Sequence, residues 1–294
     1  MSFKILYYVQ LLLVKGVKIV TAVLLTALLA FFVIMWNLRT QPINVTPYML
    51  NVQKETHVKP QQRWVPLDSI SPDVIKSVIV CEDNNFFFHF GFDVDAIKEA
   101  MQHNQQGKKV YGASTITQQM VKNVFLSHQR TWVRKVAELG LSVLVELMWG
   151  KARIMEVYLN VIEMGENVYG IEAAAKHHFH KRAFELTKYE SMMIALSLPN
   201  PKKFNPARPS RYMQARQEKM FETMDKLMKY GWYKNIKNIK QIKVNYLEAY
   251  PNPPRSIAKE EEPVVENEQD TTEIESEGEE AEEDNIDTII VNNE

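Results

Sequence analysis

The sequence has only one cysteine, Cys81, among its 294 residues, which excludes an intramolecular disulfide. A lone cysteine inside an apolar stretch is typical of a small buried residue rather than a reactive thiol. A P-loop, a dinucleotide-binding glycine motif, a cysteine–histidine metal cluster and a G-x-S-x-G elbow are also absent from the sequence. Their absence excludes the commonest nucleotide-dependent and serine-nucleophile chemistries.

Three histidines do lie close together, at His177, His178 and His180. They are adjacent or two apart rather than four apart, so one face of a helix cannot present all of them to a metal ion. We interpret them as surface residues.

Charge is absent from residues 19–36, a run long enough to span a bilayer as a helix at about 1.5 Å per residue. Three lysines precede the run, Lys4, Lys15 and Lys18, whereas only Arg39 follows closely. The positive-inside rule therefore predicts a cytoplasmic N-terminus and a body on the outer side of the membrane. The alternative is a cleaved signal peptide, whose apolar core is about 7 to 15 residues long and ends at small residues. Because this run ends in bulky side chains and Trp36, we favour an anchor.

Basic residues are missing from residues 260–294, which carry 16 acidic side chains. The rest of the chain keeps 20 acidic and 35 basic residues, a charge of about +15. We interpret the acidic tail as disordered, with a cation-buffering or partner-binding arm as the alternative. The basic body, on the outer side of a membrane, suits an anionic ligand or an anionic membrane face and argues against nucleic acid.

Strand patterns are almost absent, so we predict a mainly α-helical protein. The expected organisation is a cytoplasmic N-terminus (1–18), a transmembrane anchor (19–36), a linker (37–63), a helical domain (64–250) and an acidic disordered tail (251–294). N-cap signals at Ser71, Thr131 and Thr187 predict helix starts. Helices are expected at about 72–82, 93–103, 131–149, 151–160, 172–179, 187–198 and 208–230.

Glu82 and Asp83 fall at the C-terminal end of the helix that begins after Ser71. The helix macrodipole disfavours negative charge there, so this placement indicates a functional site, with capping or pairing as the structural alternative.

A turn at residues 112–114, with Ser114 as N-cap, should start a further helix. Gln118 and Lys122 are four apart on that helix, as are Gln119 and Asn123, so each pair projects from one face. These side chains could hold a phosphate or sugar hydroxyls, although an ordinary solvated face has the same pattern.

Arg130, Arg134 and Glu138 are also spaced by four and form a charged stripe on a largely apolar helix. An unpaired stripe facing the core would be costly, so it should line a cleft, with Arg134 beside Glu138. A purely structural ion pair is the alternative. Glu146 is interpreted as a structural carboxylate paired with an arginine or lysine. Together, Glu82 and Glu138 suit acid–base chemistry at a sugar centre with an anionic group nearby.

Residues 82–93, 112–123, 134–138 and 151–165 resemble, in order and spacing, the successive motifs of the peptidoglycan glycosyltransferases (glycosyltransferase family 51). The resemblance covers roughly residues 64–232. The chain leaves no room for a penicillin-binding transpeptidase domain, so it resembles the monofunctional biosynthetic members. Gly150 stands where the family has a polar residue, which predicts a looser helix junction there. The resemblance implies a lysozyme-like helical fold that polymerises lipid II into glycan strands with inversion.

By that resemblance, Glu82 matches the general base on the acceptor 4-hydroxyl. Glu138 matches the carboxylate that assists the departing undecaprenyl pyrophosphate, through a divalent cation (Mg²⁺ or Mn²⁺) or through Arg134 and its neighbours. Lys122 and Arg130 match pyrophosphate contacts. The other expected substrate-binding residues are Ser114, Thr115, Gln118, Gln119, Asn123 and Arg134, and the supporting residues are Asp83 and His89.

The implied partners are lipid II, the growing glycan chain and the membrane, with other cell-wall synthesis or division proteins as candidates. The implied location is the cytoplasmic (inner) membrane, with a periplasmic catalytic domain. Residues 92–109 are a candidate mobile flap near the membrane.

Two other functional classes stay open. One is a lysozyme-like lytic hydrolase, which needs no pyrophosphate-binding cations. The other is an inactive anchored scaffold, although the presence of both glutamates argues against it.

Overall fold

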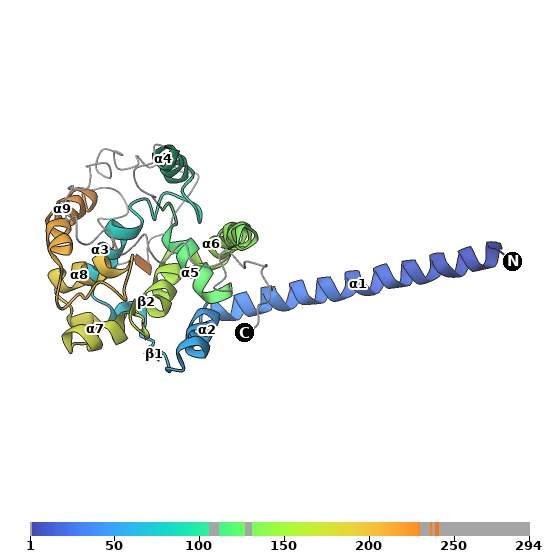
Figure 1. Ribbon diagram of the computed structural model, residues 1–294, viewed down its shortest axis with the longest axis horizontal. Coiled ribbons are helices and arrows are strands. Elements are labelled where there is room, and N and C mark those ends of the chain that lie inside the picture. The colour runs from blue at the N-terminus through green and yellow to red at the C-terminus, as the bar shows by residue number, and fades with distance from the viewer. Residues whose placement is uncertain (1, 106–111, 127–130, 230–235, 237–238, 241–294) are drawn as a thin grey trace, which may run out of the picture. The chain divides into compact units, whose positions relative to one another are not determined.

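The computed structural model describes residues 2–105, 112–126, 131–229, 236 and 239–240, and Figure 1 shows its elements. These residues are mostly helical, which confirms the predicted fold class. The expectations for Arg130 and for residues 251–294 lie outside the described residues.

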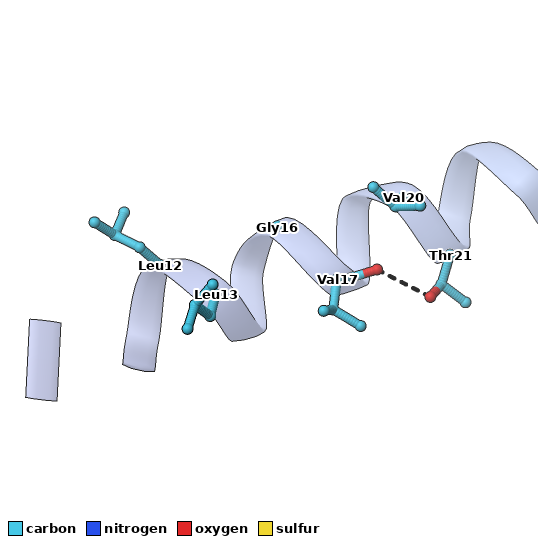
Figure 2. Close-up of a pocket in the computed structure, with 6 residues that line it drawn as sticks. All are labelled: Leu12, Leu13, Gly16, Val17, Val20 and Thr21. Atoms are coloured by element: carbon cyan, nitrogen blue, oxygen red, sulfur yellow. Dashed lines mark hydrogen bonds between the residues drawn. The ribbon is translucent and has the colours of Figure 1, made fainter. Parts of the chain in front are cut away.

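The N-terminal helix α1 (Ser2–Leu38) is longer than the predicted anchor at 19–36. Its stretch Gln10–Leu38 is long and apolar enough to cross a membrane, and only 6% of its most apolar window is buried. Gly16 leaves a shallow hollow on one face of this helix (Figure 2), which is lined by Leu12, Leu13, Val17, Val20 and Thr21. The Thr21 hydroxyl donates to the Val17 carbonyl at 2.9 Å, so the helix itself satisfies this polar group. The surface of α1 is therefore suited to an apolar solvent.

The C-terminal end of α1 is held by α6 (Trp132–Val161). The indole N–H of Trp149 donates to the Met35 carbonyl at 3.0 Å, and the Arg153 guanidinium donates to the Leu38 carbonyl at 2.8 Å. An arginine at this end also complements the helix dipole. These contacts fix the last turns of α1 on the helix that carries Glu138.

The expected linker at 37–63 is wrong as a description of this segment. It contains α2 (Pro47–Thr56), with Thr46 as N-cap, and Met49 and Val52 are buried in the core. The folded domain therefore begins earlier than residue 64, because this segment supplies apolar side chains that pack beside α5.

The remaining helices are α3 (Pro72–Glu82), α4 (Val94–Gln105), α5 (Ile116–Phe125), α7 (Ile171–Phe179), α8 (Lys188–Ser197) and α9 (Arg211–Leu227), with 3₁₀ turns at Leu67–Ser69 and Ala183–Glu185. α5 packs along α6, and α3 packs against α8 and α9. The predicted caps at Ser71, Thr131 and Thr187 are confirmed, since each side chain accepts a hydrogen bond from the first turn of its helix. Cys81 lies against the core, where burial raises the pKa of its thiol to about 12.

A small sheet accompanies the helices, formed by β1 (Gln61–Gln62), β2 (Glu163–Gly165) and β3 (Val168–Tyr169) in the order β1-β3-β2. β1 runs parallel to β3, and β2 runs antiparallel to it. Strands of two or three residues are too short for an alternating pattern to reveal, so the sequence did not predict them.

α6 bends at Gly150, whose φ of 73° and ψ of 166° are not helical. This agrees with the separate helices that the sequence predicts at 131–149 and 151–160. The bend redirects the second half of α6 into the core, where Ile154, Tyr158 and Leu159 are fully buried.

Gly170→Ala is expected to destabilise the protein. Gly170 has a φ of +78°, and a Cβ at this position would lie 2.6 Å from the Asn160 carbonyl oxygen. This backbone conformation is almost restricted to glycine, so we expect a loss of about 1–3 kcal/mol in the free energy of unfolding. Denaturant unfolding in detergent would measure it. Gly140→Ala is the matched control, because nothing lies within 4 Å of its added Cβ. We expect Gly140→Ala to keep or slightly raise stability, and equal stability of both variants would contradict the argument.

Candidate active site

Asp83 joins the end of α3 to the start of α5. It is the C-cap residue of α3, and its buried carboxylate accepts a hydrogen bond from the Ile116 backbone N–H at 3.0 Å. The same oxygen lies 2.9 Å from Nε2 of His89, which is also buried. A carboxylate at a helix N-terminus is electrostatically favourable. Asp83 and His89 therefore lie together, and their supporting role stays a prediction.

Glu82 lies one residue earlier and faces α5. Nε2 of Gln119 donates to its carboxylate at 2.7 Å, and Oε1 of Gln119 accepts from the Tyr158 hydroxyl at 3.2 Å. Burial raises the pKa of the Glu82 carboxyl, whereas the Gln119 hydrogen bond and the Arg216 guanidinium of α9 oppose that shift. Glu82 nevertheless keeps some exposure, so a substrate group can reach it.

Glu138 has a different environment, in the first half of α6. It is only 3% exposed, and its two carboxylate oxygens accept from Arg134 at 2.8 Å and from Lys135 at 2.5 Å. The predicted pairing of Arg134 with Glu138 is confirmed. Lys135 was missed as a site residue, although it directly follows Arg134 in the same motif. Its ammonium also donates to the Ser114 hydroxyl at 3.2 Å, which links Glu138 to the segment that precedes α5.

The start of α5 differs from the expectation by one residue, because the N-cap is Thr115 and not Ser114. Thr115 and Gln118 form a reciprocal capping box, and the Thr115 hydroxyl also donates to the Gly91 carbonyl at 2.7 Å. Both residues are almost fully buried, and Nε2 of Gln118 has no hydrogen-bond partner among the described residues. Ser114, which lies before the helix, is the residue of this turn that reaches the Glu138 cluster.

Further along α5, Asn123 donates to the Gln119 carbonyl at 2.8 Å, and Lys122 is partly exposed. Gln119 and Asn123 therefore share a face, as their spacing predicts. Substrate binding stays a prediction for all the described residues of the expected set: Ser114, Thr115, Gln118, Gln119, Lys122, Asn123 and Arg134.

A second buried polar cluster supports the first. Glu146 and Lys151, on either side of the Gly150 bend, form an ion pair at 2.6 Å, which confirms that Glu146 is a structural carboxylate. Glu146 also accepts from the Thr117 hydroxyl at 2.7 Å, and Lys151 donates to the His89 carbonyl at 2.9 Å. Burial lowers the pKa of Lys151, although Glu146 opposes that shift. The cluster connects α5, α6 and the segment that follows Asp83.

A hollow of about 330 Å³ lies beside His89, between the end of α3 and the start of α4. Asn85 and Asp93, which also line it, are joined by a hydrogen bond of 2.7 Å. Asp93 accepts from the backbone N–H groups of Asp95 and Ala96, so it caps α4. The predicted flap at 92–109 therefore contains a capped helix in its described part, and its mobility stays a prediction.

The described residues contain no group of three or more histidine, cysteine, aspartate or glutamate side chains that could hold a metal ion. His178, one of the three clustered histidines, lies with Nε2 3.0 Å from the Met164 carbonyl oxygen. At Glu138, both carboxylate oxygens are engaged by cationic side chains. This donor set fits an anion-binding cluster better than a metal centre.

Residues 50–225 match the model of the transglycosylase family. A biosynthetic peptidoglycan transglycosylase of Bdellovibrio bacteriovorus is 49% identical over 187 residues, which are 62% of this chain and 75% of the relative. A protein with the same name from Bacteroides thetaiotaomicron is 46% identical over 197 residues (65% and 79% of the two chains). A third, from Pasteurella multocida, is 41% identical over 201 residues (65% and 80%).

The match begins inside α2 and continues through the carboxylates of α3 and α6 to the last turns of α9, so it contains the whole site described above. It covers more than half of the sequence, and the relatives agree in name over a similar length. The chain belongs to the transglycosylase family: it is a glycosyltransferase with a lysozyme-like helical domain that acts on peptidoglycan precursors.

Proposed function

We propose that this enzyme polymerises lipid II, with Glu82 as the general base and Glu138 as the organiser of a cationic site for the leaving pyrophosphate. The observation that carries the proposal is the difference between the two carboxylates. Glu82 contacts a neutral amide at 2.7 Å, whereas Glu138 contacts two cationic side chains at 2.8 and 2.5 Å. An acid–base group and an anion-stabilising group need these different surroundings.

At Glu82, the carboxylate takes the proton of the acceptor 4-hydroxyl as that oxygen attacks the anomeric carbon of the growing chain. The glycosidic bond forms as the bond to undecaprenyl pyrophosphate breaks, and the anomeric configuration inverts. A sugar hydroxyl is a weak nucleophile, so a positioned base contributes about 10²- to 10⁴-fold in rate. The raised pKa of Glu82 brings the carboxylate closer to the working pH, which favours proton transfer.

At Glu138, the carboxylate holds Arg134 and Lys135 in place, so that their N–H groups can stabilise negative charge on the departing pyrophosphate. Lys122 and Arg130 are proposed as further pyrophosphate contacts. A divalent cation, Mg²⁺ or Mn²⁺, stays an alternative at Glu138. We favour the direct cationic route because Arg134 and Lys135 engage both carboxylate oxygens.

A lipid-linked substrate stays in the bilayer, so the enzyme should work at the membrane surface. We propose that α1 is a single-pass anchor in the cytoplasmic membrane, with its N-terminus in the cytoplasm and the catalytic domain in the periplasm. Trp132, Val133, Val136 and Leu147 of α6 are all more than half exposed and apolar, which suits contact with the same bilayer. Other cell-wall synthesis or division proteins are candidate partners.

A lytic hydrolase would also use a buried glutamate in a lysozyme-like fold. The cationic cluster at Glu138 favours the polymerase, because hydrolysis of a finished glycan releases no pyrophosphate. An inactive scaffold would not need a base whose amide partner is itself held by a buried tyrosine.

Glu82→Gln is expected to reduce lipid II polymerisation by at least about 10²-fold, because the amide has nearly the same shape and cannot accept the proton. The measurement is polymer formation from labelled lipid II by detergent-solubilised protein. Glu166→Gln is the matched control, since Glu166 is exposed and should leave the rate unchanged. A wild-type protein that cleaves finished glycan and makes no polymer would contradict the proposal.

Glu138→Gln is expected to lower kcat by about 10²- to 10³-fold, because Arg134 and Lys135 lose the charge that orients them.

The direct cationic route also predicts that wild-type activity survives excess EDTA. If EDTA abolishes polymerisation and Mg²⁺ or Mn²⁺ restores it, the metal route is correct and the direct one is wrong.

A further inference from the structure

Tyr158 is fully buried in the second half of α6 and has a polar contact close to Glu82. Its hydroxyl donates to Oε1 of Gln119 at 3.2 Å, and Nε2 of Gln119 donates to Glu82 at 2.7 Å. Tyr158, Gln119 and Glu82 therefore form a hydrogen-bonded chain with contributions from α6, α5 and α3. An aromatic residue on an apolar helix is usually a core residue, so sequence patterns alone did not single out this tyrosine.

The direction of the hydrogen bonds in this chain matters for Glu82. A glutamine amide can present either its NH₂ group or its carbonyl oxygen to a neighbour. The NH₂ group stabilises an ionised carboxylate, whereas the carbonyl oxygen accepts only from the protonated acid. By donating to Oε1, the Tyr158 hydroxyl favours the amide orientation in which NH₂ faces Glu82.

The Tyr158 hydroxyl remains a donor at any pH at which the enzyme could work. Burial, together with the nearby Glu82 and Asp83 carboxylates, raises its pKa well above the ordinary value. A phenol that stays protonated can donate to Oε1 continuously. Loss of the hydroxyl would leave the partly buried carbonyl oxygen of Gln119 without this partner and make the reversed amide more favourable.

We propose that Tyr158 is a positioning residue that acts through Gln119 to keep Glu82 ionised and ready to accept a proton. This inference rests on the proposed function of Glu82 as general base. Tyr158 does not itself contact the reacting atoms in this scheme, and it sets the orientation of the amide that does face the base.

Other groups around Glu82 also act on its pKa. Arg216 of α9 lowers the pKa of Glu82 by its charge, and the adjacent Asp83 raises it. On the α8 side, Cys81 contacts the uncharged Met192 thioether at 3.6 Å. Tyr158→Phe leaves all of these groups in place and keeps the aromatic ring, so it isolates the contribution of the hydroxyl.

Tyr158→Phe is expected to shift the acidic limb of the kcat–pH profile upward by about half to one pH unit, which corresponds to one net hydrogen bond. The shift is upward because, without the Tyr158 hydroxyl, the ionised form of Glu82 is less favoured and its pKa rises. The rate should fall at low pH, recover at higher pH and leave KM for lipid II unchanged. The measurement is the pH dependence of polymerisation, with thermal unfolding as a check that the variant is folded.

Tyr169→Phe is the matched control. Tyr169 is also fully buried, and within the described part of the chain its hydroxyl has no hydrogen-bond partner. Its removal should leave the pH profile in place. Gln119→Ala should shift the profile in the same direction as Tyr158→Phe, and combining the two changes should add no further shift.

Two outcomes would overturn the inference while leaving the proposed function intact. One is a rate for Tyr158→Phe that falls equally at every pH. The other is a shift of the pH profile by Tyr158→Phe that is the same in the Gln119→Ala background as in the wild-type background. Infrared titration of the Glu82 carboxyl, assigned by subtraction of the Glu82→Gln spectrum, reports the same pKa change without substrate. A wild-type protein that makes no polymer at any pH would instead overturn the proposed function, and the infrared titration would still test the chain.

Discussion

The arrangement of the site depends on the buried carboxylate of Asp83. It accepts from the first backbone N–H of α5 and lies beside His89. If the end of α3 separated from the start of α5, the buried Asp83 carboxylate would lose this backbone partner, which is costly. The His89 carbonyl then accepts from Lys151, and Lys151 pairs with Glu146. Glu146 in turn accepts from the hydroxyl of Thr117, the second residue of α5. The result is a closed circuit of buried polar contacts. Each contact joins two different parts of the chain, so the circuit sets the positions of three segments together.

This circuit helps to explain why two glutamates on different helices have different surroundings. Glu82 precedes Asp83 and therefore faces the side of α5 where Gln119 lies. Glu138 is linked through Lys135 to the turn at the start of that same helix. Both carboxylates are thus positioned relative to α5, Glu82 through the Gln119 amide and Glu138 through the Lys135 ammonium. The amide leaves the first carboxylate able to exchange a proton, whereas the cations give the second an environment suited to an anionic ligand.

Local signals in the sequence predicted many of the helix starts and the pairs on one helix face. Contacts between residues far apart in the chain were hardly predicted. Caps and helix-face pairs depend on residues three or four apart, so Thr131 and the Arg134–Glu138 pair were correct. The pairing of Glu146 with Lys151, five residues on, depends on the bend at Gly150 and not on helical spacing. The segment 37–63 was misread because its buried side chains follow no long period, although Thr46 followed by a proline carries the same start signal as Ser71. Tyr158 was missed because a buried aromatic residue has the same pattern whether or not its hydroxyl is used.

The second half of α6 connects the proposed general base with the proposed membrane anchor. Trp149 and Arg153 hold the end of α1 through backbone carbonyls, and Tyr158, just over one turn further along the same helix, reaches Gln119. Backbone carbonyls are fixed by the helix they belong to, so these contacts define the position of α1 whatever its apolar side chains touch. If α1 lies in the bilayer, the distance from the membrane to Glu82 is set by the packed contacts of α6 with α1 and with Gln119. Under the proposed function, a lipid-linked substrate then meets Glu82 at a constant depth, which suits repeated addition of membrane-bound units.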